Sequence, residues 1–249
     1  MYQLLLQAKQ ILQIQGLRFY INKAKKAKVW SDPNADIKNT IKQYSSMFNV
    51  FVDIGANIGQ ITLDVANNFS KCISVEPSIE NYNQLNENLQ NRKISNVTTF
   101  NCALGKKKGI GKLFLSPYRI EQHRLKTAPN ENWKTQNVEI RTLDDILEEL
   151  DIHEKCVIKI DAEGSELPIF LGSPNTLQKD CVIISEIHPF LISINGFEPY
   201  DYVNFLESLG YSFFNLNGKP TSKKYLSRLC LKGKDKKYVF DNFLIKKCK

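Results

Sequence analysis

The chain has 249 residues, of which 42% are hydrophobic and 24% charged, which is enough for one large domain with a sizeable core. No apolar run reaches the roughly 18–20 residues that a membrane span needs. The six cysteines form no C-x-x-C pair, which argues against a zinc site or a disulfide framework and predicts a reduced, cytoplasmic protein.

The net charge of +8 is unevenly distributed. Residues 1–30 carry 6 Lys or Arg and no acid, and residues 219–249 carry 11 against 2, whereas residues 31–218 carry 17 against 24. Two basic ends could make a weak contact with an anionic membrane surface, or contact nucleic acid or an anionic substrate, or simply be solvated. We expect residues 1–45 to be a helical, basic extension and residues 46–249 to be the catalytic domain.

Apolar runs and helical periods alternate from residue 50 onward. Strands are predicted at 50–54, 72–75, 97–101, 112–115, 138–141, 157–160, 182–187, 211–216 and 238–245, with helices at 59–68, 77–91, 142–150, 166–171 and 200–209. Residues 117–137 are predicted to be a long loop, and residues 219–249 a basic C-terminal segment that includes the last strand. This alternation is typical of an α/β fold with a mostly parallel sheet and helices on both faces. With no helix predicted between the last two strands, we expect the final strand to be antiparallel and inserted into the sheet.

The sharpest motif is VDIGANIG at residues 52–59, which joins the end of a predicted strand to the start of a helix. Its glycines permit a sharp turn and a close approach of a ligand to the backbone. The spacing differs from the G-x-G-x-x-G of dinucleotide sites, and the Asp53 carboxylate would repel a diphosphate. The same carboxylate suits the cationic amino group and sulfonium of S-adenosylmethionine. We therefore predict a donor site formed by Asp53, Gly55, Asn57 and Gly59, with an ordinary tight turn as the alternative.

Two further strand ends add polar groups to this donor site. Glu76 follows Asp53 by 23 positions, close to the roughly 20-residue offset of an acid that binds ribose hydroxyls. Asn101 and Ala103 follow the third strand, where an amide could bind the adenine or its neighbouring backbone. A solvated loop acid and a turn capped by Asn and Gly are the respective alternatives.

The acceptor side is predicted from the segment IKIDAEGSEL at residues 158–167. Asp161 and Glu163 leave a buried strand, where either could take a proton from the acceptor or orient it, unless both only cap a helix. His188 ends the next strand and is either a base that titrates near neutral pH or a structural residue. Asp161, Glu163 and Glu186 could also bind a divalent cation, but our prediction includes no metal.

These motifs, in this order and spacing, resemble those of the FkbM-type S-adenosylmethionine-dependent methyltransferases. The similar segments are VDIGANIG, VEP at 75–77, NCALG at 101–105, RTLDD at 141–145, IKIDAEGSEL and DNFL at 241–244. The resemblance covers about residues 50–245. It implies a Rossmann-like class I methyltransferase fold, with seven strands of which the last is antiparallel. It also implies S-adenosylmethionine as the methyl donor and O-methylation, often of sugar hydroxyls.

By position, the resemblance assigns Asp53, Gly55, Asn57, Gly59 and Glu76 to the donor site, and Asp161 and Glu163 to the acidic motif of the family. We therefore expect an enzyme that methylates a hydroxyl of a small molecule or glycan. A nucleic-acid methyltransferase and a non-catalytic nucleoside-binding module are the alternatives. The sequence contains no Asn-Pro-Pro-Tyr-like motif and no recognisable RNA-binding module, which argues against nucleic acid. Residues 117–137 and the basic tail have no counterpart in the resemblance and are expected to shape acceptor choice.

Overall fold

The structure of the protein is a computed structural model that describes residues 32–116, 125, 133–236 and 239–248. The chain is divided into two compact units, Met1–Ala35 and Asp36–Lys249. Most of the helical, basic extension expected at 1–45 and most of the loop expected at 117–137 lie outside the described residues. The unit Asp36–Lys249 contains the glycine motif, the acidic segment and all the strands predicted from the sequence.

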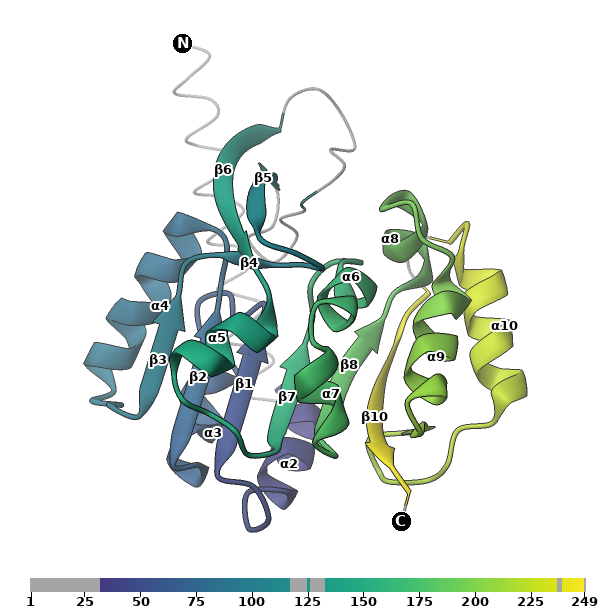
Figure 1. Cartoon of the computed structure of the whole chain (residues 1–249), viewed down its shortest axis with the longest axis horizontal. Coiled ribbons are helices and arrows are strands. Elements are labelled where there is room, and N and C mark those ends of the chain that lie inside the picture. The colour runs from purple at the N-terminus through teal and green to yellow at the C-terminus, as the bar shows by residue number, and fades with distance from the viewer. Residues whose placement is uncertain (1–31, 117–124, 126–132, 237–238, 249) are drawn as a thin grey trace, which may run out of the picture. The chain divides into compact units, whose positions relative to one another are not determined.

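A seven-stranded sheet forms the centre of this unit, in the order β3-β2-β1-β7-β8-β10-β9 (Figure 1). Neighbouring strands from β3 to β8 are parallel, and β10 is antiparallel to both β8 and β9. This confirms the α/β fold class, the strand number and the inserted antiparallel last strand. The strands are β1 (Val50–Ile54), β2 (Lys71–Val75), β3 (Val97–Phe100), β7 (Cys156–Ile160), β8 (Val182–Ile187), β9 (Tyr211–Phe214) and β10 (Asp241–Lys247).

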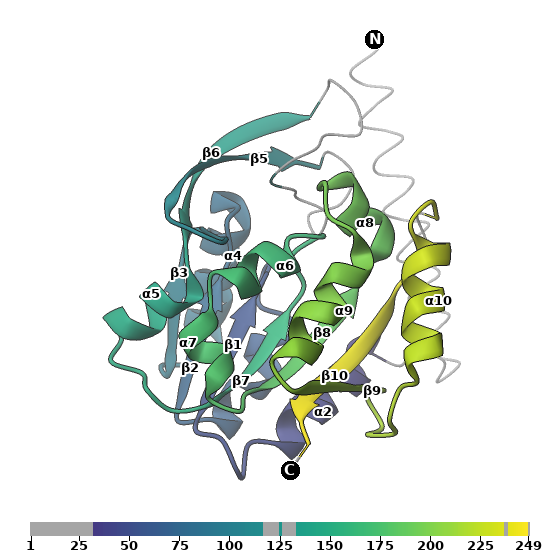
Figure 2. The ribbon, with the colours of Figure 1, turned by 45° about the vertical axis from the view of Figure 1, so that its right-hand side comes forward.

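Helices cover both faces of the sheet (Figures 1 and 2). One apolar cluster joins one side of β1 and β7 to helices α5, α6, α7, α9 and α10, and a second joins the other side to α2 and α3. The helices are α2 (Ala35–Gln43), α3 (Thr62–Val65), η1 (Ala66–Asn68), α4 (Ile79–Asn91), α5 (Leu143–Glu149), α6 (Glu166–Leu171), α7 (Pro174–Gln178), α8 (Pro189–Ile194), α9 (Pro199–Ser208) and α10 (Lys223–Gly233).

The central strands are mostly apolar because both of their faces are covered. Every residue of β1 and of β7 is buried, as expected for parallel strands with helices on both sides. Side chains of a strand alternate between the two faces, so Val52 and Ile158 pack in one cluster, while Phe51 and Val157 pack in the other. This packing fixes the positions at which β1 and β7 end, and therefore the relative height of the loops that follow them.

Two predictions about local structure were wrong. The last two strands of the large sheet are separated by helix α10, whose Leu226, Leu229 and Cys230 are buried. The lysine-rich composition of this segment hid its apolar face. A second sheet of three strands was also missed: β4 (Ala103–Leu104), β5 (Gly109–Leu115) and β6 (Lys134–Arg141), in the order β4-β6-β5. Strand β6 takes up residues 134–137, which were assigned to the long loop.

All six cysteines lie among the described residues and are free thiols, five of them buried. In the part of the chain that the structure describes, no helix has the length and apolar character needed to cross a bilayer.

Candidate functional site

The polar residues singled out in the sequence gather at one edge of the large sheet, where the parallel strands β1, β2, β7 and β8 end. Ligands of open α/β sheets bind outside this carboxyl edge. The loop 55–61 follows β1 and separates it from α3, so the helix begins three residues later than the predicted residue 59.

The loop after β1 depends on two glycines and an asparagine with positive φ. Gly55, Asn57 and Gly59 have φ angles of +75°, +52° and +89°. A Cβ atom on Gly55 would lie 2.0 Å from the carbonyl oxygen of Asp161, so only glycine allows this loop to lie against the end of β7. A Cβ on Gly59 would lie 2.6 Å from Leu85 of α4. The three residues predicted for this turn therefore shape it together, and two of them set its contact with neighbouring elements.

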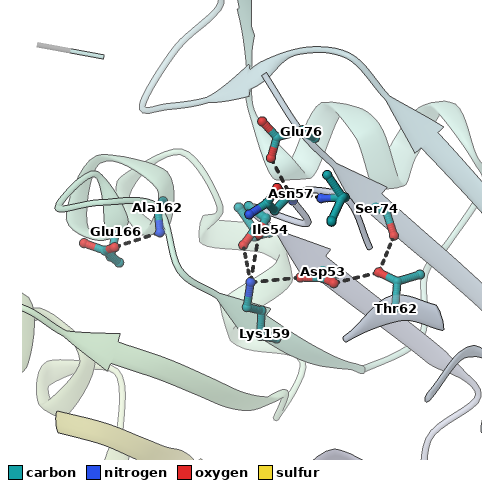
Figure 3. A network of polar contacts seen from close by, with 11 residues as sticks. Asp53, Ile54, Asn57, Thr62, Ser74, Glu76, Lys159, Ala162 and Glu166 are labelled. Atoms are coloured by element: carbon teal, nitrogen blue, oxygen red, sulfur yellow. Dashed lines mark hydrogen bonds and ion pairs between the residues drawn. The ribbon is translucent and has the colours of Figure 1, made fainter. Parts of the chain in front are cut away.

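Glu76, at the end of β2, holds this loop (Figure 3). The Asn57 N–H donates to Glu76 Oε2 and the Ser78 N–H donates to Glu76 Oε1, both at 2.9 Å. Burial raises the pKa of Glu76 to about 7, although both amide donors act to lower it. The Asn81 side chain also hydrogen-bonds to this carboxylate, so the protein occupies three of its roughly four acceptor positions. Glu76 thus lies beside the glycine loop, as the sequence predicted.

Asn101 and Ala103 lie beyond β3 in different roles. The Asn101 side-chain amide donates to the carbonyls of Glu76 at 2.9 Å and Pro77 at 3.1 Å, so it holds the turn after β2. Ala103 is buried in the small sheet, where it packs with Leu113 and Val138. The prediction that Ala103 belongs to the donor site gains no support from its side chain, which lies in an apolar core.

Asp53 is fully buried, which corrects the prediction that its carboxylate faces the donor. Thr62 Oγ1 donates to Asp53 Oδ2 at 2.6 Å, and Lys159 Nζ forms an ion pair with Asp53 Oδ1 at 3.2 Å. The Thr62 hydroxyl lies 2.9 Å from that of Ser74 on β2. Asp53 therefore supports the loop through Thr62 of α3 and Lys159 of β7, and Thr62 in turn contacts Ser74 of β2 (Figure 3).

Lys159 is the functional residue that sequence reasoning missed. Its Nζ donates to the carbonyl of Gly55 at 2.9 Å, so the same ammonium group links Asp53 to the loop backbone. Burial alone would lower the pKa of Lys159, but the charges of Asp53 and Asp161 outweigh it and the pKa lies above its usual range. A lysine between two isoleucines in a buried strand was the available signal, because a buried cation requires a partner.

The acidic segment after β7 is held in a similar way by another glutamate, Glu166. Ala162 N–H and Gly164 N–H donate to Glu166 Oε1 at 2.9 and 3.2 Å. Glu166 is buried, which raises its pKa to about 7. Asp161 is exposed, and Glu163 is half-buried with a φ of +52°. The two predicted catalytic acids therefore lie on an ordered turn at the carboxyl edge, next to the loop of β1.

His188 directly follows β8, which places the third predicted catalytic residue at the same edge. Its ring stacks on Phe240, with 5.3 Å between centroids and 18° between planes. The centroid of the Phe190 ring lies 6.5 Å from that of His188, and the two rings are tilted relative to each other. The half-buried Glu186 precedes it in β8, and the pKa of Glu186 is raised to about 8 by burial, then by the charges of Asp161 and Glu166. Among the described residues, no group of three His, Cys, Asp or Glu side chains is arranged to hold a metal ion.

Comparison with known proteins relates this site to one family. The family model of the methyltransferase FkbM domain matches residues 53–213, which include the loop of β1, Glu76 and the acidic segment. The chain is also similar to the hexuronic acid methyltransferase AglP of Haloferax volcanii, with 25% identity over 172 residues. This alignment covers 69% of the chain and 66% of that relative, so the chain spans just under two thirds of the relative's length.

Solved structures with a similar fold include other methyltransferases. An O-methyltransferase from Bacillus cereus, in complex with SAH, has a TM-score of 0.48 and 12% identity, with 94% of this chain and 90% of that chain covered. An rRNA methylase from Streptococcus thermophilus has a TM-score of 0.47 and 9% identity, with 88% and 98% covered. Both TM-scores lie below 0.5.

Proposed function

The chain belongs to the methyltransferase FkbM domain family, and from this premise we propose that it transfers a methyl group from S-adenosylmethionine to a hydroxyl of a sugar or glycan. The observation that carries the proposal is the loop of β1 joined to the Glu76 carboxylate by the Asn57 amide at 2.9 Å. The hexuronic acid methyltransferase relative supports a sugar as the acceptor.

The residues of the carboxyl edge fit the donor. Glu76 retains about one acceptor position, which suits a ribose hydroxyl. Gly55 and Gly59 let the loop pack against the end of β7 and against α4, which gives it the sharp turn beside Glu76 where the nucleoside would bind. The donor would supply a methyl group activated by a positively charged sulfur. Asn57, Gly55, Gly59 and Glu76 would hold it, while Asp53 and Lys159 fix the loop from below.

The rest of the edge is proposed to bind the acceptor. Methyl transfer is an in-line displacement, so the protein has to align two reactants, which can contribute roughly 7–11 kcal/mol. An alcohol also has to lose its proton, and a positioned base adds about 10²–10⁴-fold. Asp161, Glu163 and His188, which the sequence predicted for this role, follow β7 and β8 at the same edge.

Two measurements test this function in sequence. Calorimetry with S-adenosylhomocysteine should show one binding site per chain. Methyl-labelled S-adenosylmethionine should then transfer label to uronic acid glycosides or neutral hexosides, with the product identified by mass spectrometry. Transfer of label to RNA, at a rate that falls steeply as the salt concentration rises, would contradict a sugar acceptor, since binding to a polyanion depends strongly on salt. Absence of S-adenosylhomocysteine binding would contradict S-adenosylmethionine as the methyl donor.

A further inference from the structure

Glu186 is a carboxylate at the carboxyl edge to which neither the sequence motifs nor the donor site give a catalytic role. It is the penultimate residue of β8. Ile160 of β7 pairs with Ser185 of β8, so the next residues, Asp161 just after β7 and Glu186 still within β8, lie side by side. Glu186 therefore lies next to the acidic segment, one strand farther from the donor loop.

Glu186 also shares a face of the sheet with the buried ion pair. Asp53 pairs with Lys159 across β1 and β7, and Lys159 pairs with Ile184 across β7 and β8. Because strand side chains alternate, Glu186 points to the same face as Ile184, two residues nearer the edge. Adjacent strands lie about 4.8 Å apart, so β8 is about 10 Å from β1. An acceptor placed over β7 would lie between a donor on the β1 loop and Glu186.

Glu186 differs from the two other glutamates of the edge in what its carboxylate contacts. Glu76 and Glu166 each accept two backbone N–H groups, which fixes them as supports of loops. Among the described residues, the carboxylate of Glu186 has no hydrogen-bond or ion-pair partner, and its side chain is half-buried rather than enclosed. Glu186 is therefore available to a ligand, whereas backbone amides occupy much of the hydrogen-bonding capacity of the other two.

Charged residues surround Glu186 on the neighbouring elements of the fold. Asp161 and Lys159 face it from β7 and Glu166 from α6, while Asp241 begins the neighbouring strand β10 opposite Ile187. Burial and the two nearby acids raise the pKa of Glu186 to about 8, and Lys159 opposes them. A base is most efficient when its pKa lies near the working pH, because it is then both ionised and strongly basic.

We propose that Glu186 is the general base that removes the proton from the acceptor hydroxyl, an assignment that rests on the proposed sugar O-methylation. The hydroxyl proton passes to a carboxylate oxygen of Glu186 as the acceptor oxygen forms its bond to the methyl carbon. The bond between that carbon and sulfur breaks, and its electron pair remains on sulfur. The neutral thioether and the methyl ether leave, and Glu186 returns its proton to water.

The test compares Glu186→Gln with wild type and with Glu154→Gln. Glu154 is an exposed residue before β7, at the opposite edge of the sheet, so the same substitution there should leave turnover unchanged. Transfer of labelled methyl to methyl glucuronoside and to methyl glucoside is measured from about pH 6 to about pH 9. S-adenosylhomocysteine affinity and the thermal unfolding midpoint are measured for each variant. Glu186→Asp, which keeps a carboxylate, serves as a second variant.

Glu186→Gln should lower kcat about 100-fold or more, with S-adenosylhomocysteine affinity within about twofold of wild type. The rise of wild-type kcat toward about pH 8 should disappear, and Glu186→Asp should recover part of the rate. Wild-type transfer together with a Glu186→Gln rate within about threefold would overturn the role of Glu186 and leave the proposed function intact. Donor binding without transfer to either glycoside would overturn the sugar proposal and the role of Glu186 with it.

Discussion

The two halves of the carboxyl edge use their polar groups differently. On the β1–β2 half, Glu76 accepts two backbone amides, and Asp53 is enclosed between Thr62 and Lys159. On the β7–β8 half, Asp161 is exposed and Glu186 is half-buried, with no hydrogen-bond partner for its carboxylate among the described residues. Glu166 holds the loop after β7 much as Glu76 holds the loop after β1, but the β7–β8 half also has carboxylates that the proposed function assigns to the substrate.

Under the proposed function, this difference explains how one edge would serve two ligands. A loop held in its binding conformation before the ligand arrives loses less entropy on binding, which favours a donor shared by many reactions. Catalysis instead needs a group whose protonation can change in the reaction, and such a group cannot also be a fixed support. Lys159 connects the halves, because it lies on β7 but bonds to the loop of β1.

The largest effect should come from placing a methyl group between the two halves. Gly55→Ala puts a Cβ atom 2.0 Å from the Asp161 carbonyl oxygen and strains a φ of +75°. We expect the free energy of unfolding to fall by about 4 kcal/mol or more, with loss of donor binding. Gly210→Ala is the matched control, since it has a φ of +84° with open space around the Cβ. Backbone strain alone should lower the free energy of unfolding of Gly210→Ala by about 1–2 kcal/mol. Equal losses of unfolding free energy for the two variants in urea would show that the contact of Gly55 with Asp161 does not matter.

The next effect should come from breaking the link that Lys159 makes. Lys159→Met leaves the Asp53 carboxylate buried without its cation, which should lower the free energy of unfolding by about 3 kcal/mol. Asp53→Asn combined with Lys159→Met removes both charges and should recover part of this loss. Chemical denaturation of the four proteins in the double-mutant cycle gives the coupling. Additive losses would show that the two side chains do not act as a pair.

The smallest of these effects concerns the support of the acidic segment. Burial raises the pKa of Glu166 to about 7, well above the usual range of a glutamate. The native state keeps this proton at pH values where the unfolded state has lost it, so stability falls as the pH rises from about 5 to about 7. Glu166→Gln keeps a carbonyl for both amides and should reduce that fall by about 2 kcal/mol. Urea midpoints at the two pH values measure it, and an unchanged slope would exclude Glu166 as its source.

The sequence predicted those features of this edge that depend on residues close together along the chain. The glycine loop and the acids at strand ends are local patterns, and parallel strands of equal register bring them together without further information. The position of Glu76 beside the glycine loop followed from these patterns. Helix α10 was hidden because its lysines dominate the composition, although Leu226, Leu229 and Cys230 already had a helical spacing.

The features that escaped prediction depend on contacts across strands. Asp53 was expected to face a ligand because it stands at a strand end, but the register of β1 against β7 places Lys159 next to it. No local pattern contains that register. The small sheet was missed for a similar reason, since the two residues of β4 form a strand only through their pairing with Ile140 and Arg141 of β6.

Calorimetric titration of S-adenosylhomocysteine into Glu76→Gln is the sharpest test of the division between the two halves, in which Glu76 holds the donor loop and Glu186 serves the acceptor. The Gln side chain must present its NH₂ group to the Asn57 or Ser78 amide, so we expect the dissociation constant to rise about 100-fold. Glu154→Gln and Glu186→Gln should keep the wild-type value within about twofold. Wild-type affinity in Glu76→Gln, or an equal loss in Glu186→Gln, would contradict this division.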